Sequence, residues 1–163
     1  MKKTITLLLI LTCCGCIDRN RMITGLEGKP MPSFDLLLND NVTHLNTNSI
    51  PEGKPIVLFS FGPDCPFCRT EMKDIVDNYQ QLQGIRFYVF TSARFRDMQR
   101  FYAYCGLQKQ HSIIVGIDSA NFFSGYYGAP GVPYLAIYDP RKKLICTLLG
   151  KISIDRINDI AFE

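Results

Sequence analysis

The feature that most constrains how this chain folds is a pair of cysteines, Cys65 and Cys68, placed directly after the apolar run 56–61 and the turn residues 62–64. A short apolar run bounded by a turn is typical of a buried strand, and the periodic segment that follows is typical of a helix. The pair is therefore expected at a strand-to-helix junction. There, unpaired backbone N–H groups and the helix dipole favour the thiolate form of Cys65, which is the reactive form.

This context favours a redox pair over a structural or metal-binding one. After the leader, no second pair of Cys or His residues stands at ligand spacing, and the two histidines, His44 and His111, are expected in solvated loops. We therefore expect no bound metal and no cofactor beyond the disulfide of the pair itself. In exchange chemistry Cys65 attacks a client disulfide as the nucleophile and Cys68 resolves the mixed disulfide, and the same steps in reverse oxidise a dithiol.

Length and charge limit the number of domains and the kinds of partner. The chain has 163 residues, of which 47% are hydrophobic, and this suits one compact domain with a short N-terminal appendage. The net charge is +3, and it falls to +1 when the leader that carries Lys2 and Lys3 is removed. A nearly neutral chain gives no electrostatic reason to expect a nucleic acid partner.

The first sixteen residues have the pattern of an export signal, with Lys2 and Lys3, an apolar core over 5–11 and small residues up to Cys16. The core is too short to span a bilayer. Small residues ending at a cysteine also resemble a bacterial lipobox, with Cys16 as the lipidated residue and Cys14 as the alternative. An ordinary secretory signal is the third interpretation. In each case the protein leaves the cytoplasm, and a lipid anchor would hold it on a membrane facing the periplasm or extracytoplasmic space.

The pattern predicts a leader over 1–15, a polar tether over 16–29 and a folded domain over 30–163. Within the domain we expect a hairpin of 34–38 and 42–45, strand 56–61, helix 70–82, strand 85–90, helix 94–104, strand 112–117, a short helix 121–127, a hairpin of 134–138 and 144–149, and helix 154–162. This order requires a mixed sheet with helices on both faces.

Four segments in order make the chain similar to the thioredoxin superfamily, and within it to the extracytoplasmic TlpA/ResA-type thiol-disulfide oxidoreductases. They are 31–36, 54–61, 65–68 and 131–135, and the resemblance extends from about Pro30 to the C-terminus. It implies an α/β, thioredoxin-like three-layer fold with a mixed central sheet, helices on both faces and an N-terminal β-hairpin extension. It also implies protein dithiol or disulfide clients and an upstream thiol redox partner.

The same resemblance implies that the peptide bond before Pro133 is cis and lies beside the active-site sulfurs, with the Val132 backbone available to an extended client. A trans proline that starts an edge strand is the alternative. Pro66 and Phe67, between the two cysteines, complete the expected client-binding surface.

The chain departs from thioredoxin at positions that influence redox behaviour. Phe59 stands six residues before Cys65, where thioredoxins carry a buried Asp, so water or another acid must accept the proton of the resolving thiol. The Pro66-Phe67 spacer resembles that of glutaredoxins and places no cationic His beside the thiolate. We expect a reductant of exported clients, with thiol oxidation or isomerisation as the alternative.

Other interpretations compete at two points. A peroxiredoxin shares the opening strands, but its peroxidatic cysteine needs a Thr three residues earlier, where this chain has Gly62. A non-catalytic binding module normally lacks one or both of the cysteines. Cys105 and Cys146 could form a structural disulfide, stay buried as small apolar side chains, or relay electrons to the active pair.

Overall fold

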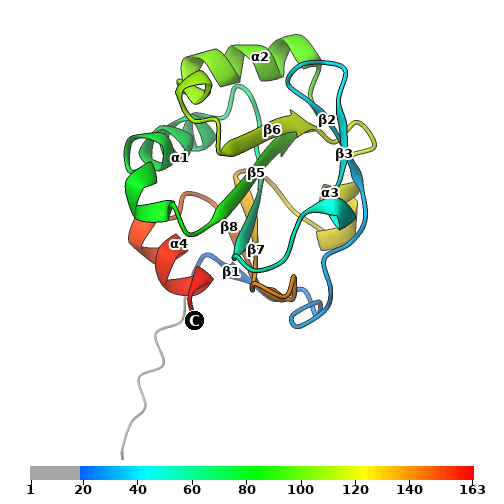
Figure 1. Ribbon diagram of the computed structural model, residues 1–163, viewed down its shortest axis with the longest axis vertical. Helices are drawn as coiled ribbons and strands as arrows, with labels where there is room; N and C mark the ends of the chain where they lie inside the picture. The colour runs from blue at the N-terminus through cyan, green and yellow to red at the C-terminus, as the bar shows by residue number, and fades with distance from the viewer. Residues whose placement is uncertain (1–18) are drawn as a thin grey trace, which may run out of the picture.

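The computed structural model describes residues 19–163, which form a mixed sheet with helices on both faces (Figure 1). The strands are β1 (Arg21–Met22), β2 (Asp35–Leu38), β3 (His44–Asn46), β4 (Ile56–Ser60), β5 (Arg86–Thr91), β6 (Ile113–Ile117), β7 (Tyr134–Tyr138) and β8 (Leu144–Leu149). The helices are α1 (Pro66–Asp77), α2 (Phe95–Tyr104), α3 (Phe122–Tyr127) and α4 (Ile154–Ala161), and the short 3-10 helices are η1 (Thr47–Ser49), η2 (Tyr79–Leu82) and η3 (Leu107–Lys109). The strand order in the sheet is β1-β8-β7-β4-β5-β6-β2-β3.

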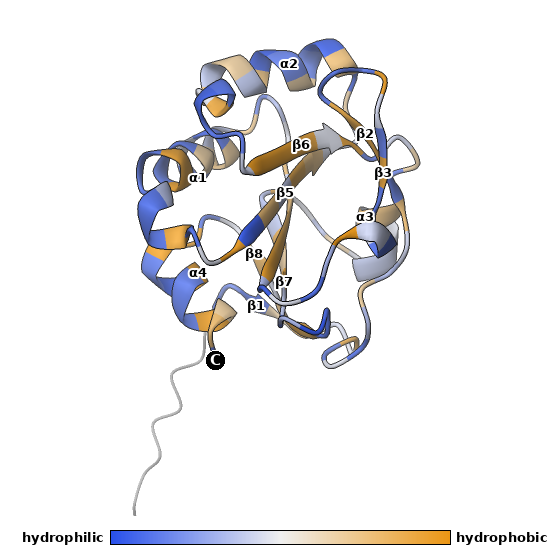
Figure 2. Cartoon of the chain, in the orientation of Figure 1, coloured by the Kyte–Doolittle hydropathy of each residue, from blue (hydrophilic) through white to orange (hydrophobic). Residues whose placement is uncertain are grey.

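Strand β4 lies in the middle of the sheet because its side chains are apolar on both faces. It runs parallel to β5 and antiparallel to β7, and all five of its residues are buried. Val57 and Phe59 belong to the core on one face, and Ile56 and Leu58 to the core on the other, as the alternation of a strand requires. Figure 2 shows these central strands as hydrophobic and much of the helical surface as hydrophilic. The strand that leads to the cysteine pair therefore comes directly out of the core.

Helices cover both faces of the sheet. On the face of Val57, helices α1, α2 and α4 contribute buried residues such as Met72, Phe101 and Ile157. On the opposite face, α3 contributes Phe123, together with apolar residues from the chain around β2. The α/β fold expected from the sequence, with a mixed sheet between helical layers, is confirmed.

Strands β2 and β3 form the expected N-terminal hairpin. Asp40 Oδ1 accepts hydrogen bonds from the N–H groups of Val42 (3.0 Å) and Thr43 (2.9 Å) in the turn. Asn41 takes a left-handed conformation there, with φ 61°, which Asn tolerates better than most residues. Because β2 also pairs antiparallel with β6, the hairpin extends the main sheet.

The segment before the hairpin differs from the expected tether over 16–29. Strand β1 pairs antiparallel with β8, and the Asn20 side chain donates to the Leu149 carbonyl at 2.7 Å. Further along, the Gly28 N–H donates to the Leu144 carbonyl at 2.8 Å. From Asn20 onward this segment is therefore part of the folded sheet. Its polar sequence gave no strand signal because the strand is only two residues long.

Helix α1 begins earlier than the apolar period suggested, at Pro66 rather than at residue 70. The reason is that Cys65 caps the helix with its side chain and Pro66 occupies the first turn, where its missing N–H costs nothing. The helix ends at Asp77, and η2 continues the chain to Leu82.

The expectations for the leader fall on residues that the structure does not describe. They concern the export signal over 1–15 and the lipidation candidates Cys14 and Cys16. Within residues 19–163, no helix combines the length and apolar character that crossing a membrane would need.

Candidate active site

The two cysteines lie where β4 ends and α1 begins. Cys65 is the N-cap residue of α1, with φ −71° and ψ 118°, and its sulfur accepts a hydrogen bond from the Cys68 N–H at 3.4 Å. Cys65 is partly exposed, whereas Cys68 is fully buried. An incoming disulfide can therefore reach Cys65 but not Cys68, and burial alone makes the two thiols unequal.

Burial also changes the proton chemistry of Cys68. Loss of solvent raises the pKa of the Cys68 thiol far above its usual range, and the hydrogen bond with Cys65 adds to the effect. Desolvation disfavours the charged form of a thiol. Cys68 therefore stays protonated until it reacts, and its reaction as a nucleophile needs a nearby base.

The loop before β7 brings Val132 and Pro133 to the cysteine pair. The Val132–Pro133 peptide bond is cis, as the sequence resemblance implied, and the Cys65 thiol donates to the Val132 carbonyl oxygen at 3.6 Å. Gly62 permits this close approach, because a Cβ there would lie 3.1 Å from Val132 Cγ2 and 3.4 Å from Cys65 Cβ. A larger residue at 62 would therefore press against the Val132 side chain.

Apolar side chains surround the exposed side of Cys65. Phe67 is 63% exposed and Val132 is 38% exposed, and exposed apolar side chains that lie together often mark an interaction site. Pro66 is also exposed, in the first turn of α1. These residues and Pro133 were expected from the sequence to bind clients, and that role stays a prediction.

Glu71 is a residue of this site that the sequence reasoning missed. It lies in α1 one turn after Cys68 and is fully buried. Its Oε1 accepts a hydrogen bond from the Ile152 N–H at 3.1 Å, and its Oε2 has no hydrogen-bond partner among the described residues. Burial raises the pKa of Glu71 to about 8, against smaller opposing effects of the Ile152 N–H and the Lys151 charge. The carboxyl is therefore a much stronger base than an ordinary one.

Glu71 is thus a candidate for the buried acid that the sequence lacks at Phe59. Phe59 is fully buried in the apolar core, on the same face of the sheet as α1. The signal for Glu71 was its spacing: residues three apart lie on the same side of a helix, so an acid three residues after a buried cysteine is a candidate for burial. The apolar residues Met72 and Ile75, which follow Glu71 in α1, are also fully buried.

Arg69 holds the loop that precedes the nucleophile. Its Nε donates to the Pro63 carbonyl at 2.8 Å, and its Nη2 forms an ion pair with Asp64 at 2.9 Å. The guanidinium carbon also lies 5.0 Å from the centre of the Tyr104 ring, in α2. The loop 62–64 is thus connected to both α1 and α2, and this connection keeps Cys65 facing Val132.

We expect Arg69→Gln to lower the free energy of unfolding by about 1 to 2 kcal/mol, because it removes a charged hydrogen bond to a backbone carbonyl and a partly exposed ion pair. Urea denaturation checks this value. Lys73→Gln is the matched control, since Lys73 lies over the same Tyr104 ring, 4.7 Å from its centre, but has no hydrogen bond to the loop. Equal losses in both variants would show that the loop contacts contribute nothing.

The two remaining described cysteines, Cys105 and Cys146, are both buried in the core on the face of α1. The Cys105 sulfur lies 4.0 Å from the Arg69 carbonyl oxygen, and burial raises the pKa of the Cys105 thiol to about 11. Of the three roles considered from the sequence, burial as small apolar side chains describes both. Among residues 19–163, no group of three or more His, Cys, Asp or Glu side chains could hold a metal ion.

Solved structures with this fold include several thiol-disulfide oxidoreductases. The thioredoxin domain of such an enzyme from Bacteroides vulgatus is 16% identical, with a TM-score of 0.65 over 82% of this chain and 93% of its own. A secreted Mycobacterium tuberculosis disulfide oxidoreductase, described as homologous to DsbE of E. coli, is 19% identical, with a TM-score of 0.64 over 79% of this chain and 94% of its own. A thioredoxin-like protein from Aeropyrum pernix is 14% identical, with a TM-score of 0.63 over 78% and 87%. Identities this low establish the thioredoxin-like fold alone.

Sequence comparison places the chain more narrowly. No curated protein matches it. The pattern of the AhpC/TSA family matches residues 28–147, which include the hairpin, the cysteine pair and the Val132–Pro133 loop. This range is well over half of the 163 residues. The chain therefore belongs to the AhpC/TSA family, with a thioredoxin-like fold.

Proposed function

We propose that the protein catalyses thiol-disulfide exchange on exported client proteins, with Cys65 as the nucleophile and Cys68 as the resolving thiol. The observation that carries the proposal is the asymmetric pair: a partly exposed Cys65 at a helix N-terminus and a fully buried Cys68 one turn later. The AhpC/TSA family and the thiol-disulfide oxidoreductases that share the fold support an oxidoreductase.

The reaction balances on these residues. The Cys65 thiolate attacks a client disulfide and forms a mixed disulfide, and the departing client thiolate takes up a proton from solvent. Cys68 then gives its proton to the Glu71 carboxylate and attacks the Cys65 sulfur, which releases the second client thiolate and leaves the Cys65–Cys68 disulfide. Two electrons pass from the protein to the client. An upstream dithiol partner returns them by the reverse steps, so the disulfide pair itself is the cofactor.

Client binding in this scheme uses the exposed apolar surface around Cys65. Pro66 and Phe67 follow the nucleophile in α1 and are exposed, as is Val132, whose carbonyl oxygen contacts the Cys65 sulfur. Pro133, next to Val132, is itself buried. An extended client segment would pair with the Val132 backbone. The Val132 carbonyl oxygen already lies near the Cys65 sulfur. Apolar side chains next to the client disulfide would therefore favour binding.

Reduction is the favoured direction, because no cationic His stands between the cysteines to stabilise the Cys65 thiolate strongly and make the pair a strong oxidant. Thiol oxidation or isomerisation is the alternative within the same chemistry. We further propose export through the leader 1–15 and a lipid anchor at Cys16, with Cys14 as the alternative. The DsbE homologue among the fold neighbours is described as secreted, which agrees with an extracytoplasmic place.

A peroxidase is the rival that the family allows. Such an enzyme needs a hydroxyl three residues before its reactive cysteine, and here that position is Gly62. A side chain at 62 would also meet Val132 Cγ2 at 3.1 Å from its Cβ. Exchange chemistry therefore fits the loop better than peroxide reduction, and consumption of hydrogen peroxide by the purified protein measures the rival directly.

Trapping tests the proposal in cells. In a Cys68→Ser variant the mixed disulfide cannot be resolved, so we expect client proteins to accumulate as adducts on Cys65 that disappear on reduction with dithiothreitol. Cys105→Ser is the control, because it removes a buried thiol and leaves the pair intact. Absence of Cys65 adducts in the exported fraction, with the variant folded and present, would count against exchange chemistry.

A further inference from the structure

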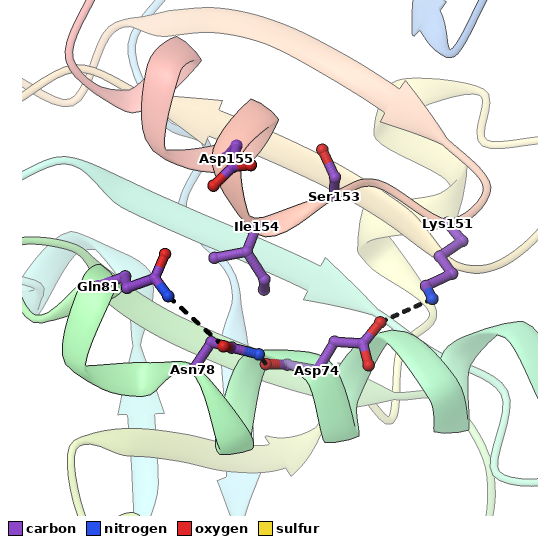
Figure 3. A pocket seen from close by; sticks show the side chains of 7 residues that line it. All are labelled: Asp74, Asn78, Gln81, Lys151, Ser153, Ile154 and Asp155. Carbon is purple, nitrogen blue, oxygen red and sulfur yellow. Dashed lines mark hydrogen bonds and ion pairs between the residues drawn. The ribbon is translucent and has the colours of Figure 1, made fainter.

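A cavity lies beside two residues that flank Glu71, one in α1 and one in the chain after β8. A cavity of about 570 Å³ opens between α1 with η2 and the chain that enters α4, and Asp74, Lys151 and Asp155 are among the side chains that line it (Figure 3). In Figure 3 Asp74 from α1 and Lys151 from the chain after β8 point toward each other across one end of it.

Both residues of this pair lie close to Glu71 or to the group that holds it. Asp74 follows Glu71 by three residues in α1, on the same side of the helix. Lys151 precedes Ile152, whose N–H donates to Glu71 Oε1 at 3.1 Å. The ion pair between Lys151 Nζ and Asp74 Oδ2 measures 2.6 Å, and the side chains are 39% and 43% exposed. The pair therefore joins the two segments that flank Glu71, α1 and the chain after β8, at the edge of the cavity.

The charged and titratable groups around Glu71 come from three elements. Helix α1 provides Cys68 on the active-site side and Asp74 on the cavity side. The chain after β8 provides Lys151, and α4 provides Asp155 on the cavity wall. The positive charge of Lys151 lowers the pKa of Glu71 and the negative charge of Asp74 raises it, so the two members of one ion pair act on Glu71 with opposite signs.

We propose that Asp74 and Lys151 are positioning residues that control the proton exchange of Glu71 from its solvent side. The inference rests on the proposed function, in which Glu71 receives the proton of Cys68. In that step the Cys68 S–H bond breaks, a Glu71 O–H bond forms, and the Cys68 sulfur bonds to Cys65 while the client thiolate leaves. Glu71 then passes the proton to water at the cavity and is ready for the next cycle. The ion pair sets the pH at which the Glu71 carboxyl is free to accept.

Two substitutions in the full-length chain test this control because they break the same ion pair with opposite electrostatic results. Lys151→Met removes the cation and leaves Asp74 uncompensated, so we expect the pKa of Glu71 to rise by about half a unit or more. Asp74→Asn leaves Lys151 uncompensated, and we expect a fall of similar size. The readouts are the carboxyl signal of Glu71 by carbon-13 NMR and the pH profile of the resolution step in single-turnover reduction of a peptide disulfide. At pH 7 a pKa shift of half a unit changes the ionised fraction of Glu71, and with it the rate, about threefold. The rate should fall in Lys151→Met and rise in Asp74→Asn.

Controls separate this inference from the function on which it rests. Lys151→Arg keeps the charge and should restore the wild-type profile, and Lys143→Met removes an exposed cation from the β7–β8 turn without effect. If the pKa of Glu71 shifts with the same sign in Lys151→Met and Asp74→Asn, or shifts in neither, the ion pair does not regulate Glu71. A pH profile unchanged by Glu71→Gln would instead overturn the proton step itself, and failure of the wild-type protein to reduce the peptide would overturn the proposed function.

Discussion

Cys65→Ser is expected to reduce the rate of insulin disulfide reduction by about a thousandfold or more, because a serine hydroxyl cannot replace the thiolate as nucleophile at neutral pH. The substitution changes one atom at a partly exposed N-cap position, and serine is itself a good N-cap residue, so the fold is expected to persist. The turbidity of precipitating insulin, followed with dithiothreitol as the electron source, measures the rate.

The same assay on Cys105→Ser provides the comparison, since that cysteine is buried and the rate of this variant should stay within a few-fold of the wild type. Turnover that persists in Cys65→Ser at more than a few per cent would move the nucleophile to another residue.

Glu71→Gln is expected to change how stability depends on pH. The pKa of Glu71 is about 8 in the folded protein and near the ordinary value of 4.5 when the chain is unfolded. Between these two values the folded state binds more protons at this site than the unfolded state, so the free energy of unfolding falls as pH rises. The slope is about 1.4 kcal/mol per pH unit, which amounts to several kcal/mol lost by pH 8. The neutral Gln side chain removes this dependence.

Urea denaturation at intervals from pH 4 to pH 9 measures the effect. Wild-type and Glu71→Gln stabilities should diverge as pH rises above 4.5, with the variant more stable near pH 8. Glu52→Gln, at an exposed position in the loop before β4, should follow the wild-type curve. Parallel curves for Glu71→Gln and the wild type would mean that the Glu71 carboxyl is ionised in the folded state at ordinary pH.

The parts of the fold that the sequence predicted are those encoded by local pattern. Strand β4 is a continuous apolar run, and α4 repeats apolar residues at Ile154, Ile157 and Ile160, so both could be placed within a residue or so of their observed bounds. The cysteine pair was located by the junction of two such elements. The cis bond before Pro133 came from resemblance, because local residues alone do not distinguish it from a trans bond.

The features that were missed depend on distant partners. Strand β1 exists because Arg21 pairs with Leu148, at the other end of the chain, and two residues carry no period of their own. Glu71 was missed because the resemblance to thioredoxin points to the position of Phe59 for a buried acid, and not to α1. What makes Glu71 a base is its burial beside Ile152, about eighty residues away in sequence, and only tertiary packing brings that N–H to the carboxyl.

The pairing of β1 with β8 also limits how far the cysteine pair can lie from an N-terminal anchor. Ser60 at the end of β4 pairs with Tyr134, which pairs with Leu149, and the Leu149 N–H donates to the Asn20 carbonyl at 2.8 Å. The chain therefore enters the domain at the same end of the sheet as the cysteine pair. With the proposed anchor at Cys16, four residues span at most about 14 Å to Asn20. Such a short connection would keep Cys65 close to the lipid surface. The disulfides within its reach would then be those of membrane proteins or of clients that bind beside the bilayer.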